Sequence, residues 1–104
     1  MIVVTSSEIA GKRIVTTLGI VRGNTVRARH IGKDIIAVFK NIIGGEIEEY
    51  TKLMSESREQ ALDRMISSAQ ELGANAILDV RFSTSAIMGG AAEILVYGTA
   101  AVIE

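Results

Sequence analysis

The stretch that decides the fold covers twelve residues and reads Glu71-Leu72-Gly73-Ala74-Asn75-Ala76-Ile77-Leu78-Asp79-Val80-Arg81-Phe82. A helical apolar spacing ends at Leu72, and Gly73 follows at the position where a left-handed glycine commonly ends a helix. Beyond it the residues alternate, with Ala76, Leu78, Val80 and Phe82 on an apolar face and Ile77, Asp79, Arg81 and Ser83 on a mixed face. Such alternation predicts a strand that starts within a few residues of the helix end.

Two helices are expected before this strand. Apolar residues at helical spacing predict one over residues 31–43, which Gly44-Gly45 ends. A longer one is predicted from Glu46 to Leu72, with acidic residues in its first turn. The run Ser55-Glu56-Ser57 leaves open whether this second helix is continuous or divided in two.

Strands are expected at both ends of the chain, over residues 2–5, 12–29, 76–85 and 93–103. Gly19 to Asn24 indicates a bulge, a close backbone approach or a turn. A hairpin centred on Gly89 would place Leu78 opposite Ala100 and Val80 opposite Gly98, large beside small. The same register would set Arg81 beside Tyr97 and Asp79 beside Thr99. The whole chain, 1–104, is therefore predicted to be one α+β domain, with a mixed β-sheet and two helices between N- and C-terminal strands.

The composition favours self-association. Hydrophobic residues make up 48% of the 104 residues and aromatic residues only 4%, which is more small apolar surface than one thin core buries. We therefore expect a homo-oligomer. The net charge of -1 argues against nucleic acid as a partner, and the basic cluster of Arg22, Arg27, Arg29 and Lys33 is explained by a solvated rim or by an intersubunit ion-pair surface. No apolar run is long enough for a membrane helix and no signal peptide is evident, so a cytoplasmic protein is expected.

Candidate metal ligands are few, because the chain has no cysteine and one histidine. His30 and Asp34 could share a metal if His30 lies in the first helical turn, and Glu46 is a third candidate. Each residue also has a purely structural explanation, since His30 can start a helix and Glu46 can complement a helix dipole. Any resident cofactor would then be a divalent metal ion bound by carboxylate or imidazole.

A second candidate site is the polar set Asp79, Arg81, Tyr97 and Thr99, which could hold a small ligand on one sheet face. The alternative is an inter-strand ion pair with hydrogen bonds at a subunit interface. The sequence contains no recognisable pair of nucleophile and base, so we expect no enzymatic activity.

Five segments in order carry a family resemblance: residues 18–26, 31–35, 41–46, 72–76 and 97–100. Together they resemble the YbjQ-like family of small bacterial proteins, which is described as heavy-metal-binding and whose biochemical function is not established. The resemblance implies a dodecin-like subunit in a closed ring of five, with an inner β layer and an outer helical shell. It also implies a metal-binding oligomer, and the alternative is a small-ligand-binding or structural ring without a metal role. Because thiophilic metals prefer thiolate ligands, this cysteine-free chain is expected to bind any metal weakly.

Overall fold

The computed structural model describes residues 1–28, 48–87 and 91–104. It confirms the α+β class, with a four-stranded mixed sheet and a helix between the N- and C-terminal strands. The first predicted helix, over residues 31–43, lies outside the described residues. The described elements are β1 (Ile2–Val3), β2 (Ile14–Ala28), α2 (Glu48–Glu71), β3 (Ala76–Ile87) and β4 (Ala91–Ile103).

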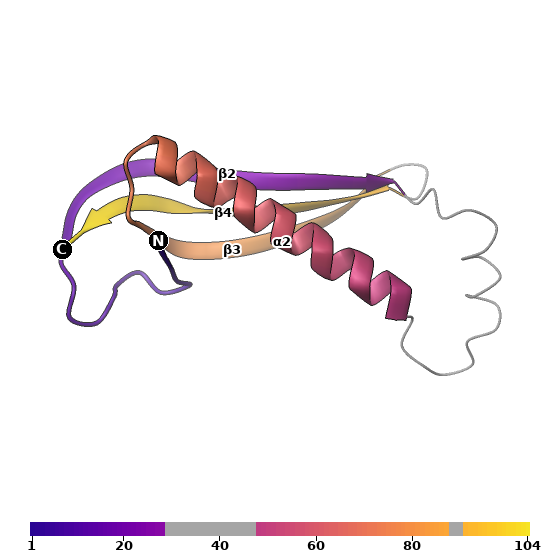
Figure 1. The fold of residues 1–104 in the computed structure, drawn as a ribbon, viewed down its shortest axis with the longest axis horizontal. Helices are drawn as coiled ribbons and strands as arrows, with labels where there is room; N and C mark the ends of the chain where they lie inside the picture. Colours follow the sequence, from indigo (N-terminus) through magenta and orange to yellow (C-terminus); the bar gives the residue numbers. More distant parts are fainter. Residues whose placement is uncertain (29–47, 88–90) are drawn as a thin grey trace.

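The sheet has the strand order β1-β3-β4-β2. β1 runs parallel to β3, and β4 pairs antiparallel with both β3 and β2. α2 crosses one face of the sheet at an angle (Figure 1), and it packs mainly against β2 and β4. In the described part of the chain no helix or strand packs on the opposite face, which we call the open face, although Ala76, Leu78 and Ala101 on that face are buried.

The core lies between α2 and the sheet. Ala61, Met65 and Ala69 form the buried side of α2, and each is 0% exposed. The sheet supplies the other side with Val21, Ile77, Val80, Ile94, Val96 and Ala100. Gly23 on β2 lets the helix come close, because a Cβ there would lie 2.0 Å from the Ala61 carbonyl oxygen.

α2 is one continuous helix of 24 residues, so the run at Ser55 to Ser57 does not divide it. The buried Ser57 hydroxyl donates to the Leu53 carbonyl one turn earlier at 2.9 Å, which satisfies it inside the helix. The helix ends as the sequence predicts. Gly73 has a φ of 83° and donates to the Gln70 carbonyl, while Ala74 donates to Ala69, the two bonds of a Schellman cap.

The hairpin register is confirmed in one half and wrong in the other. Arg81 pairs with Tyr97 as predicted, and the strands run further toward the turn, to Ile87 and from Ala91. Leu78, however, pairs with Thr99 instead of Ala100, because the register shifts between Leu78 and Arg81. The shift is a bulge at Asp79, whose φ of 54° is unusual for a residue with a side chain.

The bulge is held by the N-terminal segment. The Asp79 N–H donates to the Ser6 carbonyl at 3.0 Å, and the Val80 N–H donates to the Val4 carbonyl at 3.1 Å. These bonds satisfy two backbone groups that the bulged strand turns toward the segment. As a result Ile77 and Val80, three residues apart, both enter the core under α2.

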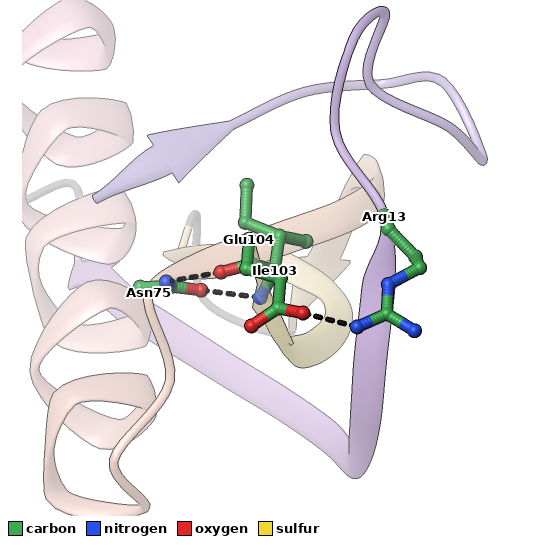
Figure 2. Close-up of polar contacts among 4 residues, drawn as sticks. All are labelled: Arg13, Asn75, Ile103 and Glu104. Carbon is green, nitrogen blue, oxygen red and sulfur yellow. Dashed lines mark hydrogen bonds and ion pairs between the residues drawn. The ribbon is translucent and has the colours of Figure 1, made fainter.

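The end of the sheet is closed by side chains (Figure 2). The Asn75 amide donates to the Ile103 carbonyl at 2.8 Å and accepts from the Ile103 N–H at 2.7 Å. Next to it the backbones of Arg13 and Glu104 exchange two hydrogen bonds, and their side chains form an ion pair. β4 is therefore fixed at its C-terminal end on both sides.

Candidate functional site

The open face carries a row of three polar residues across three strands. Tyr97 on the central strand β4 is the Cα partner of Arg22 on β2 and of Arg81 on β3. Directly paired residues share a face, and the neighbours Val96 and Gly98 are buried toward α2. The side chains of this row, which we call the arginine–tyrosine row, therefore lie on the face away from α2.

Arg81 is held in place by backbone carbonyls. Its Nη1 donates to Thr5 at 2.8 Å and to Val80 at 2.9 Å. Within the described residues, no hydrogen bond engages the other edge of the guanidinium, formed by Nε and Nη2. The Nε and Nη2 edge of an arginine can donate two parallel hydrogen bonds to a carboxylate or phosphate.

Asp79 lies two residues before Arg81 in the bulge and is not a Cα partner of any residue of the row. Its Oδ1 accepts a hydrogen bond of 2.8 Å from the Ser7 hydroxyl of the N-terminal segment. The prediction that Asp79 stands beside Thr99 is wrong, because Thr99 pairs with Leu78 on one side and Ile20 on the other. Thr99 remains on the open face, one pleat from Tyr97.

Of the four predicted ligand residues, the structure thus places Arg81 and Tyr97 side by side and Thr99 next to them. Arg22 and Ser7 were missed as partners of this set. The sequence signal for Arg22 was present in the basic cluster, but only the pairing of β2 with β4 shows which residue it faces.

The charges around the row are unbalanced. Among the described side chains the ion pair found is Arg13–Glu104, at the end of the sheet, so Arg22 and Arg81 have no carboxylate partner there. The acidic residue on β4 is Glu93, which accepts a hydrogen bond from Asn24 at 3.4 Å. The arginine–tyrosine row is therefore locally cationic in a chain whose net charge is -1.

The predicted metal ligands His30, Asp34 and Glu46 lie outside the described residues. In residues 1–28, 48–87 and 91–104 no group of three His, Cys, Asp or Glu residues could hold a metal ion. Two soft thioether donors, Met65 and Met54, belong to the core under α2, where Met65 is 0% exposed. The described donors do not fit a site for a thiophilic metal.

No helix in the described part of the chain is long and apolar enough to cross a membrane.

Comparison with known proteins agrees with this fold. A solved structure of a protein of unknown function from Pediococcus pentosaceus, of the DUF74 family, superimposes with a TM-score of 0.67. It is 16% identical and is matched over 100% of this chain and 98% of its own, so it supports the fold alone.

Sequence relatives are closer. A UPF0145 protein of Dehalococcoides mccartyi is 55% identical over 104 residues, which is 100% of both chains. A UPF0145 protein of Pyrococcus abyssi is 59% identical over 104 residues, 100% of this chain and 91% of its own. These relatives span bacteria and archaea, so the family is wider than the bacterial one expected from the resemblance.

The family model described as "Putative heavy-metal-binding" matches residues 1–104, the whole chain. The resemblance that the five sequence segments indicated is therefore confirmed by the match. This chain belongs to the YbjQ-like family, whose curated relatives carry the name UPF0145 and no specific function.

Proposed function

We propose that this protein is a cytoplasmic, non-catalytic homo-oligomer, with neither a membrane nor a nucleic acid as partner, whose copies join through the edges of their sheets. The observation that carries the proposal is the edge strand β2. It is 15 residues long and pairs with β4 on one side, and in the described residues it has no neighbour on the other. A long unpaired edge is a template for another strand.

Exposed apolar residues support the proposal. On the outer strand β2 they are Ile14, Val15, Ile20 and Val26. Phe82 is 48% exposed on β3, beyond the two positions where β1 covers that edge. Apolar surface of this kind marks contacts between proteins.

The free edge of β2 and the part of the β3 edge that β1 does not cover also run in compatible directions. β2 and β3 are each antiparallel to β4, so they run parallel to one another. The β2 edge of one copy can therefore pair with the β3 edge of the next, which is a head-to-tail contact that closes a ring. We propose five subunits, the number that the family resemblance implies.

Absence of catalysis is part of this proposal. The Ser7 hydroxyl donates a hydrogen bond to the Asp79 carboxylate, and the sequence contains no recognisable pair of nucleophile and base. A serine is a weak nucleophile unless an adjacent base activates it.

Light scattering after size exclusion tests the assembly. We expect the wild-type protein to have the mass of five 11.1 kDa chains at micromolar concentration. Ile20→Lys should dissociate the ring, since a lysine on an edge strand opposes pairing and Ile20 is 81% exposed in the subunit. Leu72→Lys is the control, because Leu72 is 51% exposed just beyond the end of α2 and belongs to none of the strands. A monomeric wild-type protein would contradict the proposal.

For metals, we propose weak binding through oxygen and nitrogen donors, with His30, Asp34 and Glu46 as the candidate ligands. The family is described as heavy-metal-binding, but this chain has no cysteine and its Met65 is buried in the core. In a ring, each ligand residue is repeated once per subunit around the symmetry axis. Copies of one residue from several subunits can therefore bind the same metal ion.

Calorimetry on chelator-free protein tests the metal proposal. Cadmium, a thiophilic ion, should bind more weakly than about 1 µM, because the chain has no cysteine thiolate to bind it. Any binding of zinc should weaken in His30→Ala, while Met65→Leu should leave it unchanged. Tight stoichiometric binding of cadmium to the wild-type protein would show that the proposal is wrong.

A further inference from the structure

We infer that neighbouring copies pair over one half of the sheet, with residues 23–28 of β2 in one copy beside residues 82–87 of β3 in the next. The N-terminal segment, residues 2–6, excludes the second copy from the other half of the β3 edge. This inference rests on the proposed assembly through sheet edges, to which it adds the register of the contact. The assembly can be correct while this register is wrong, and separate measurements distinguish the two.

Backbone hydrogen bonds hold the N-terminal segment along the first part of the β3 edge. The Ile2 N–H donates to the Asn75 carbonyl at 3.1 Å. The Val4 N–H donates to the Ile77 carbonyl at 3.0 Å, and the Val4 carbonyl accepts from the Val80 N–H. β1 runs parallel to β3 here, which is also the direction that the β2 strand of a second copy would have. The segment therefore occupies the place where that strand would pair.

The side chain of Arg81 marks the end of the covered part of the edge. Its Nη1 donates to the Thr5 carbonyl at 2.8 Å and to the Val80 carbonyl at 2.9 Å, so the guanidinium lies between the segment and β3. A charged side chain at a sheet edge opposes the addition of another strand. Beyond it, no strand of the described chain pairs with the outer edge of residues 82–87.

The outer edge of β2 is divided in the same way. Two register shifts interrupt its pairing with β4 before Gly19, and the pairing is regular from Gly19 to Ala28. Bulges twist an edge strand and oppose pairing on its outer side. Residues 23–28 of β2 are the Cα partners of residues 91–96 of β4, and so are residues 82–87 of β3. The regular part of β2 and the free part of β3 thus lie level with each other at one end of the sheet (Figure 1).

Ring closure keeps these two segments opposite each other. A cyclic ring relates neighbouring copies by a rotation without translation along its axis. With strands that run along this axis, residues that are level within one copy are also level between copies. Val26 of one copy then faces Ser85 of the next, since both are Cα partners of Glu93. Ile20 precedes the paired part of β2 and packs against the N-terminal segment of the next copy, so it remains in the contact.

Disulfide cross-linking of the full-length oligomer tests this register, and the wild-type chain has no cysteine that could interfere. The test variant carries both Val26→Cys and Ser85→Cys, at two exposed positions. Within one copy these positions lie two strand spacings apart, about 10 Å, which is too far for a disulfide. Mild oxidation should therefore link separate copies, and a non-reducing denaturing gel should show a ladder up to the size of the ring.

A second pair of cysteines is the matched control. Thr17→Cys combined with Ser85→Cys keeps the cysteine on β3 and moves the other to an exposed position in the bulged part of β2. It should give no more cross-linked product than Ser85→Cys alone, because the two positions lie far apart along the strands.

The role of the N-terminal segment is tested by Val4→Pro, which removes the N–H that donates to the Ile77 carbonyl. Once the segment is released, β2 of a second copy can pair at more than one register. Light scattering should then show a broad range of masses in place of a single one. Thr5→Pro is the control, since Thr5 contributes its carbonyl to Arg81 and proline retains a carbonyl, so the single mass should be kept.

Three results would overturn the inference. An oligomeric wild-type protein whose Val26–Ser85 cysteine pair gives no ladder, or no more than the Thr17–Ser85 pair, would show that the register is wrong while the assembly stands. A single, unchanged mass for folded Val4→Pro would show that the N-terminal segment does not limit the contact. A monomeric wild-type protein would overturn both this inference and the proposed assembly.

Discussion

Gly23→Ala should destabilise the protein by at least about 3 kcal/mol, the upper range for overpacking a core. A Cβ at this position would lie 2.0 Å from the Ala61 carbonyl oxygen and 2.5 Å from the Met65 backbone nitrogen. Both atoms belong to the backbone of α2, so no side-chain rotation relieves the clash. The whole helix must move outward, and the buried contacts of Ala61 and Met65 with the sheet weaken.

Chemical denaturation of the purified variant measures this loss, and insoluble expression would be its extreme form. Gly11→Ala is the control, because nothing lies within 4 Å of a Cβ there and only the φ of 75° disfavours a side chain. Backbone strain of that kind costs about 1 kcal/mol. If both variants lost the same stability, the close approach of α2 to β2 would not be the reason for glycine at position 23.

Local signals explain what could be predicted from the sequence. The cap at Gly73 depends on neighbouring residues, and the long helix depends on a stripe within one element. The stretch from Gly19 to Asn24 was compatible with a bulge or a close approach, and both occur there. Gly19 has a φ of 112° at a shift in register with β4, while Gly23 lies under α2.

Nonlocal contacts explain what could not be predicted. The bulge at Asp79 is stabilised by Ser6 and Val4, more than 70 residues earlier, and aspartate indicates a left-handed conformation far less strongly than glycine does. The strand pattern therefore gave the wrong partner for Leu78. For the same reason Arg22 could not be assigned to Tyr97, because the register between β2 and β4 is set across the whole chain.

The bulge also determines which side chains reach the open face. Without the extra residue, the alternation would be unbroken, and Val80 and Arg81 could not keep their present faces together with Ile77. Either Ile77 would leave the core or Arg81 would be directed under α2. The strained residue at position 79 is thus tied both to stability and to the arginine–tyrosine row.

Asp79→Val should therefore destabilise the protein by about 2–4 kcal/mol, combining a β-branched residue at positive φ with the loss of a hydrogen bond. The Ser7 hydroxyl loses its acceptor, and straightening the strand offers no escape because it would expose core residues. Thermal and denaturant unfolding measure the change.

Asp79→Gly separates the two causes. It loses the same hydrogen bond from Ser7 but accepts the φ of 54° without strain, so most of the stability should be kept. Ser7→Ala, which removes the hydrogen bond alone, should cost about 1 kcal/mol or less at this exposed position. Because Asp79→Gly preserves the bulge, Arg81 keeps its face of the sheet. Equal destabilisation by glycine and valine would mean that the Asp79 carboxylate, and not its backbone conformation, holds the strand in this register.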